Sequence, residues 1–141
     1  ANVFLMGQSN GGSVAIQVAQ GQGPHSADKG YRGVVAFYPW CGAFNSFRVH
    51  LKTPLLVLGG ERDDWVPAHE CKGVRSTGAP LELVIYPEAA HSFDLEVGVH
   101  RYLGKLVGKH PQAAEDSRAR MVAFFEAQAS PPAGTMQVAQ N

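Results

Sequence analysis

The chain has 141 residues, of which 45% are hydrophobic, and this suits one domain with an apolar core of its own. Its 12 basic and 12 acidic residues balance to a formal net charge of zero, which gives no electrostatic case for binding nucleic acid or an anionic membrane surface. No apolar run reaches the roughly 18 residues that a transmembrane helix needs, so no membrane span is expected.

Four short apolar runs along the chain predict the strands of a sheet: Val3–Met6, Gly33–Tyr38, Pro54–Gly59 and Leu81–Tyr86. The second and third runs are apolar almost throughout, as strands are when helices cover both faces of a parallel sheet. The first run is also interpreted as an interior strand. The fourth has Glu82 between two leucines, which places it near an edge of the sheet.

Three segments between and after these runs can form helices: Asn10–Gln20, Pro67–Ser76 and Pro111–Ala129. In the last of them, Pro111 suits the first helical turn, and apolar side chains recur at helical spacing. Alternating strands and helices predict an α/β fold, a three-layer α/β/α sandwich around a mostly parallel sheet. Residues 1–129 are expected to belong to one domain, and the tail 130–141, which has no periodicity, is expected to be disordered.

The sequence Gly7-Gln8-Ser9-Asn10-Gly11 joins the first strand to the first helix and fits the pattern G-x-S-x-G. In this context the pattern is typical of a nucleophile elbow, a sharp turn that holds a serine Oγ above the edge of the sheet. Gly7 and Gly11 are expected to avoid Cβ collisions in the turn, and the Asn10 N–H to face a developing oxyanion. The alternative is a glycine-rich turn with an incidental serine. Neither the G-K-[ST] of a Walker loop nor the G-x-G-x-x-G of a dinucleotide-binding loop is present at this turn.

Candidate partners for Ser9 follow the later strands. The third apolar run leads into GERDDWVP at residues 60–67, and the fourth leads into YPEAAHSF at residues 86–93. Because the carboxyl ends of parallel strands meet at one edge of a sheet, an aspartate of the first loop and His91 are expected beside Ser9. The order Ser, Asp, His along the chain is the order of α/β-hydrolase triads, in which the histidine is the base and the aspartate orients it.

The segments GQSNGG, GGERDDWVP and YPEAAHSFD resemble the three catalytic blocks of the α/β-hydrolase superfamily, and most of all those of the dienelactone hydrolase family. The resemblance covers about residues 2–93, and the closing helix is similar in type. It implies that Ser9 is the nucleophile and that His91 is the general base and then the general acid. It also implies Asp63 as the orienting acid, because this residue keeps the family's spacing, and leaves Asp64 to cap the helix expected near Pro67.

Two departures from the family pattern shape the predicted function. Dienelactone hydrolase proper uses a cysteine nucleophile, and the serine at position 9 favours ordinary carboxylic esters over a dienelactone. The superfamily fold also has further strands before the nucleophile, and one of their loops supplies a second oxyanion donor. The chain is therefore expected to be the C-terminal part of a hydrolase domain whose N-terminal strands are missing, and to be poorly active by itself.

The predicted function is hydrolysis of a small-molecule carboxylic ester through an acyl-enzyme, with no metal ion and no organic cofactor. A serine peptidase of the prolyl-oligopeptidase type and a non-catalytic binding domain that retains the fold are the alternatives. Tyr38, Trp40 and Trp65 follow strand ends and either line the substrate pocket or pack the loops. The chain begins at Ala1 with no charged leader before an apolar stretch, so a targeting signal is absent or was never part of this chain, and cytoplasmic, periplasmic and secreted locations stay open.

The two cysteines are too few for a disulfide-dense scaffold or a zinc site. Cys41 follows the second predicted strand and Cys71 follows the third, so the two are expected near each other. A disulfide and two buried thiols are both open at this point. Phe93, beside His91, is expected to anchor the histidine loop by packing.

Overall fold

The computed structural model describes residues 2–22 and 30–129. The tail that we expected to be disordered, residues 130–141, lies outside the described residues.

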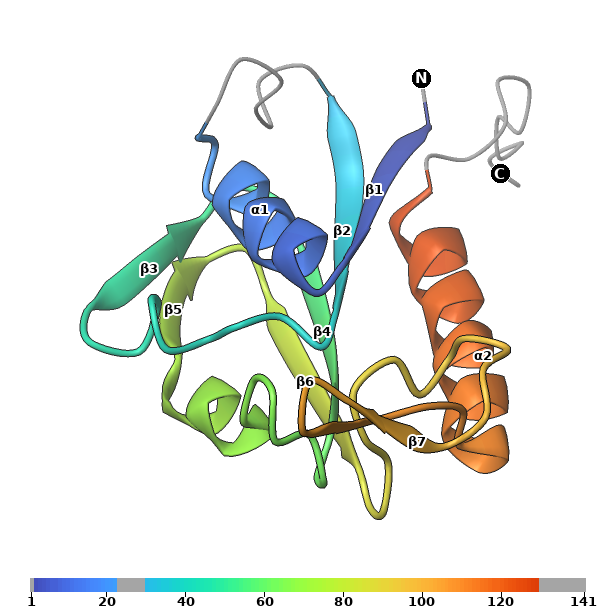
Figure 1. Ribbon diagram of the computed structural model, residues 1–141. Helices are drawn as coiled ribbons and strands as arrows, with labels where there is room; N and C mark the ends of the chain where they lie inside the picture. The colour runs from blue at the N-terminus through green and yellow to red at the C-terminus, as the bar shows by residue number, and fades with distance from the viewer. Residues whose placement is uncertain (1, 23–29, 130–141) are drawn as a thin grey trace, which may run out of the picture.

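Four parallel strands form the central sheet, in the order β1-β2-β4-β6 (Figure 1). They are β1 (Val3–Gln8), β2 (Tyr31–Phe37), β4 (Leu55–Gly60) and β6 (Leu81–Tyr86). The inner strands are the most apolar ones, and β4 is buried along its whole length, as the sequence predicts for strands covered on both faces. The edge position predicted for β6 is confirmed. β1 lies at the other edge, and no described strand pairs with its outer side.

Helices cover both faces of this sheet, so the predicted three-layer α/β architecture is confirmed (Figure 1). The helix α1 (Asn10–Ala19) packs Ile16 against Val34 and its neighbours on one face. The helix α2 (Pro111–Gln128) packs Phe124 against Val35 and its neighbours on the other. Successive residues of β2 serve opposite faces because side chains alternate along a strand. No helix of the described ranges is both long enough and apolar enough to cross a membrane.

The predicted helix over residues 67–76 is largely wrong. A short 3₁₀ helix, η2 (Ala68–Gly73), is followed by the strand β5 (Arg75–Gly78), which pairs in parallel with β3 (Arg48–Leu51). The pairing with β3 satisfies backbone groups that a longer helix would have satisfied internally. The strand ends at Gly78, whose φ of 83° is a conformation that glycine adopts without strain.

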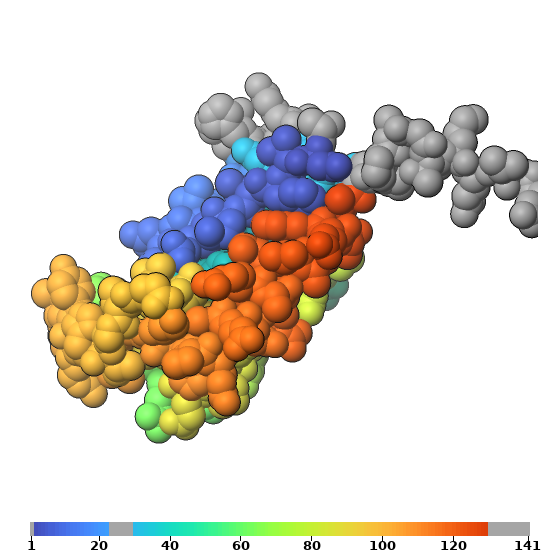
Figure 2. All heavy atoms as spheres, turned by 90° about the vertical axis from the view of Figure 1, so that its right-hand side faces the viewer, coloured from blue at the N-terminus to red at the C-terminus, as the bar shows by residue number. Residues whose placement is uncertain are grey.

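A hairpin of two three-residue strands, β7 (His100–Tyr102) and β8 (Lys105–Val107), was not predicted. Its turn residues Leu103 and Gly104 both have positive φ, as in the tight turns that suit hairpin twist. Leucine is an unusual residue for the first of these positions, and strands this short give little periodicity, so the sequence carried a weak signal. In Figure 2 the yellow-orange segment that contains the hairpin projects from one end of the molecule.

Cys41 and Cys71 form a disulfide whose Cα atoms are 4.9 Å apart. The bridge joins the loop after β2 to η2, and both residues are buried in the core on the α1 side of the sheet. Of the two possibilities that the sequence left open, the structure therefore has the disulfide.

Candidate active site

Ser9 lies in the turn between β1 and α1 with a φ of 55° and a ψ of −120°, values that are strained for a residue with a Cβ atom. Backbone hydrogen bonds hold it on both sides. Its N–H donates to the carbonyl oxygen of Phe37 at 3.0 Å, and its own carbonyl accepts from the N–H of Ser13 at 3.1 Å. The surrounding strand and helix thus fix the strained serine, as in a nucleophile elbow.

The glycines of the turn differ from expectation in one respect. A Cβ atom on Gly7 would lie 2.1 Å from the carbonyl oxygen of Gly11, so this position does require glycine. A Cβ atom on Gly11 itself would meet nothing within 4 Å, and the expected collision there is wrong. The second crowded position is Gly12, whose Cβ would lie 2.8 Å from the carbonyl oxygen of Phe37, because α1 passes close over β2 at this point.

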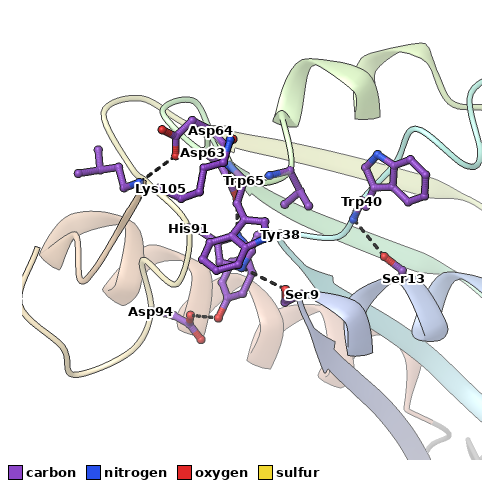
Figure 3. A network of polar contacts seen from close by, with 12 residues as sticks. Ser9, Ser13, Tyr38, Trp40, Asp63, Asp64, Trp65, His91, Asp94 and Lys105 are labelled. Atoms are coloured by element: carbon purple, nitrogen blue, oxygen red, sulfur yellow. Dashed lines mark hydrogen bonds and ion pairs between the residues drawn. The ribbon is translucent and has the colours of Figure 1, made fainter. Parts of the chain in front are cut away.

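His91 lies between Ser9 and Asp63 (Figure 3). Its Nε2 is 3.1 Å from the Oγ of Ser9, and its Nδ1 is 2.7 Å from the Oδ2 of Asp63. The backbone of the histidine is also held, because its carbonyl oxygen accepts from the N–H of Gly108 at 3.0 Å. The structure therefore brings together the three residues that the sequence proposed from three separate loops.

The carboxylate of Asp63 is almost fully buried and uses both of its oxygens. While Oδ2 contacts His91, Oδ1 accepts from the backbone N–H groups of Trp65 and Val66, each at 2.9 Å. These bonds fix the rotamer of the aspartate and direct one oxygen at the imidazole. Hydrogen bonds to a carboxylate also compensate for the cost of burying its charge.

Asp64, the competing carboxylate, points elsewhere and does not cap a helix. Its Oδ1 accepts from the N–H of Leu106 at 2.9 Å, and its carbonyl oxygen accepts from the Nζ of Lys105, also at 2.9 Å (Figure 3). The residue preceding η2 is Pro67, and no side chain caps that helix. The capping role expected for Asp64 is therefore wrong, because the unpredicted hairpin occupies its carboxylate instead.

The first helical residue after the serine is Asn10, whose N–H lies in the first turn of α1, where backbone donors have no intrahelical acceptor. Asn10 also lines the cavity beside Ser9. This is the placement that the sequence predicts for an oxyanion donor, and the role itself stays a prediction. Within the described residues, no group of three or more His, Cys, Asp or Glu side chains could hold a metal ion.

A cavity of about 460 Å³ opens above Ser9 and His91. Trp65 lines it, but Tyr38 and Trp40 do not, so two of the three aromatic residues considered for the pocket lie outside its walls. Tyr38 lies buried against the imidazole, with ring centroids 4.6 Å apart. Trp40 is half exposed, and its backbone N–H donates to the Oγ of Ser13 in α1 (Figure 3). The cavity residues that the sequence missed come mostly from the histidine loop and the hairpin, with one from the aspartate loop: Val66, Ser92, Leu95, Val97, His100, Tyr102 and Val107.

The profile of the dienelactone hydrolase family matches residues 1–129. The chain belongs to the dienelactone hydrolase family. The match includes all the elements that surround Ser9, Asp63 and His91. No curated protein matches the chain.

Solved structures show the same fold. A Klebsiella pneumoniae subsp. pneumoniae protein assigned as a dienelactone hydrolase has a TM-score of 0.62 and 22% identity, over 87% of this chain and 51% of its own. A dienelactone hydrolase-like promiscuous phosphotriesterase from metagenomic libraries has a TM-score of 0.62 and 18% identity, over 89% and 52%. Esterase 2 of Thermogutta terrifontis, phosphorylated by paraoxon, has a TM-score of 0.54 and 18% identity, over 89% and 53%. The chain thus spans about half the length of these three proteins.

Proposed function

We propose that the protein is a serine hydrolase that cleaves carboxylic esters through Ser9, His91 and Asp63. The observation that carries the proposal is the 3.1 Å contact of the Ser9 Oγ with an imidazole whose other nitrogen contacts a buried carboxylate. A serine hydroxyl is a weak nucleophile until a base removes its proton, and this contact supplies the base. Membership of the dienelactone hydrolase family supports a hydrolase, and one structural relative is named an esterase.

In the proposed first half-reaction, the Oγ of Ser9 attacks the carbonyl carbon of the ester while Nε2 of His91 takes the hydroxyl proton. The carbonyl oxygen becomes an oxyanion, which the N–H of Asn10 stabilises as one hydrogen-bond donor. Asp63 holds the proton of His91 on Nδ1 and stabilises the imidazolium that forms. The bond to the ester's alcohol oxygen then breaks, this oxygen takes from Nε2 the proton that came from Ser9, and the alcohol leaves an acyl group on Ser9.

The second half-reaction repeats these steps with water. His91 removes a proton from the water molecule, whose oxygen attacks the acyl carbon. The second tetrahedral intermediate expels the Ser9 oxygen, which recovers its proton from Nε2, and the carboxylic acid leaves.

The cavity walls indicate the kind of ester. Trp65, Leu95, Val97 and Tyr102 present apolar surface to the cavity, and among the described residues that line it there is no lysine or arginine. Apolar walls favour an uncharged acyl or alcohol group, because a buried charge without a partner is costly. This agrees with the serine nucleophile in favouring simple esters over a carboxylate-bearing dienelactone.

The test is labelling of the full-length protein with a fluorophosphonate, together with hydrolysis of p-nitrophenyl esters. We expect one label per chain on Ser9, and Ser9→Ala to lose the label and to lower kcat by a factor on the order of 10⁴. Ser46→Ala is the control, since Ser46 is an exposed loop serine away from the cavity. Activity within tenfold of wild type in Ser9→Ala would refute the assignment.

The same experiment separates the alternatives. A non-catalytic binding domain would take no label and turn over no ester. A peptidase of the prolyl-oligopeptidase type would take the label and cleave a prolyl amide at a kcat/KM comparable to that for the ester; the family match favours the esterase.

A further inference from the structure

Asp94, three residues after His91, connects the histidine loop to the nucleophile turn. Its Oδ2 accepts from the Nε2 of Gln8 at 2.7 Å, and Gln8 is the residue directly before Ser9. Its Oδ1 accepts from the hydroxyl of Tyr38, also at 2.7 Å (Figure 3). One carboxylate thus joins side chains from the ends of β1 and β2 to the segment that carries the base.

Tyr38 links Asp94 to the imidazole of His91, because it bonds the first and packs against the second. Its side chain is buried, its ring centroid lies 4.6 Å from that of His91, and its N–H donates to the carbonyl oxygen of Leu58 at 2.7 Å. Burial and the hydrogen bond to Asp94 both raise the pKa of Tyr38 above its ordinary value. The phenol therefore stays protonated and remains a donor to Asp94, and it is not a second base for Ser9.

We propose that Asp94 and Tyr38 are positioning residues that set the distance between the Ser9 Oγ and the His91 Nε2. The proposal rests on the esterase function argued above. Neither residue lines the cavity, so neither is expected to touch the substrate. Asp94 fixes the position of Ser9 through its hydrogen bond to Gln8, and it fixes the position of His91 through the Tyr38 ring that packs against the imidazole.

The physical reason is that Ser9 and His91 come from turns that are 82 positions apart in the chain. Their contact at 3.1 Å therefore depends on how the two turns are fixed to each other. A hydrogen bond with an ionised acceptor is about twice as strong as a neutral one, and Asp94 accepts two. A misplacement of about 1 Å between reacting groups lowers a rate by on the order of 10²-fold, so this connection matters more for kcat than for binding.

The experiment compares two tyrosines that have the same kind of bond. Tyr86 donates to Asp116 at 2.7 Å, as Tyr38 does to Asp94, but Tyr86 lies at the end of β6 outside the catalytic cavity. Tyr38→Phe and Tyr86→Phe each remove one hydroxyl and keep the ring. We measure kcat and KM for a p-nitrophenyl ester, the rate constant of fluorophosphonate labelling, and the thermal midpoint in the full-length protein.

We expect Tyr38→Phe to lower kcat and the labelling rate about tenfold, and Asp94→Ala up to about 10²-fold, with KM within about threefold of wild type. Tyr86→Phe should shift the thermal midpoint as much as Tyr38→Phe does and leave kcat within about twofold. The inference is overturned if Tyr38→Phe lowers kcat no more than Tyr86→Phe, or if KM changes in place of kcat. Tyr38→Phe decides the question if Asp94→Ala does not fold.

The failure of this proposal differs from failure of the proposed function. If Ser9→Ala is active, the proposed esterase mechanism is refuted. If Ser9→Ala is inactive and Tyr38→Phe is fully active, the mechanism stands and only the positioning role is refuted.

Discussion

Asp63 and His91 are 28 positions apart in the chain, and their side chains form a buried hydrogen bond of 2.7 Å between Oδ2 and Nδ1. The other carboxylate oxygen accepts hydrogen bonds from two backbone N–H groups, and these bonds fix the orientation of the carboxylate. This arrangement favours the imidazole tautomer with its proton on Nδ1. In the proposed mechanism, Nε2 is then free to accept the proton of Ser9.

Asp63→Asn tests this tautomer argument. The amide is nearly isosteric, but it can present its NH₂ group to Nδ1 and so favour the wrong tautomer. We expect kcat for ester hydrolysis to fall by up to about 10⁴-fold, with a small change in the thermal midpoint. A loss of less than tenfold would contradict the role of Asp63. Stopped-flow or steady-state ester hydrolysis measures the effect.

Asp64→Ala tests the neighbouring carboxylate, which holds the hairpin instead of the histidine. The variant removes the acceptor of the Leu106 N–H, and Tyr102 and Val107 of the same hairpin line the cavity. We expect KM to rise by about two- to fivefold, since one hydrogen bond contributes about 1 kcal/mol, and kcat to stay within about threefold. Asp64→Asn, which keeps an acceptor oxygen, is the control. A fall in kcat comparable to that of Asp63→Asn would contradict the assignment of the orienting role to Asp63.

The disulfide between Cys41 and Cys71 closes a loop with a sequence separation of 30 residues. We expect the double variant Cys41→Ser/Cys71→Ser to lose about 3 to 4 kcal/mol of unfolding free energy, because its unfolded chain is less restricted. Denaturant titration measures this loss. Intact mass without and with reductant should differ by two hydrogens, and equal masses would contradict the bridge.

Gly7→Ala and Gly11→Ala are a matched pair within one turn. A methyl group on Gly7 would collide with the Gly11 carbonyl, whereas one on Gly11 enters open space. We expect Gly7→Ala to destabilise the protein by several kcal/mol or to prevent folding, and Gly11→Ala to be neutral or to stabilise it by up to about 1 kcal/mol. Thermal denaturation decides between them, and equal effects would contradict the packing described for the elbow.

The sequence by itself determined the strand–turn–helix around Ser9, the four parallel strands and the helix that begins at Pro111. These features depend on local patterns: apolar runs, a glycine turn and a proline in the first helical turn. It also placed His91 and an aspartate of the loop after β4 near Ser9, because parallel strands end at one edge of their sheet. The preference for Asp63 over Asp64 came from family resemblance, and the contact with His91 agrees with it.

Only the tertiary structure decided which side chains complete the site. Asp94 contacts Gln8 across 86 positions and Tyr38 across 56, and Asp64 contacts Leu106 across 42. Such contacts depend on the register of the sheet and on the paths of the loops, which no local pattern specifies. The β3–β5 pairing was hidden for the same physical reason, since its partners are 27 positions apart in the chain. The sequence brought Cys41 and Cys71 near each other, but only the structure decided that they form a disulfide. The hairpin is a local feature, and it was missed because its three-residue strands give too little periodicity.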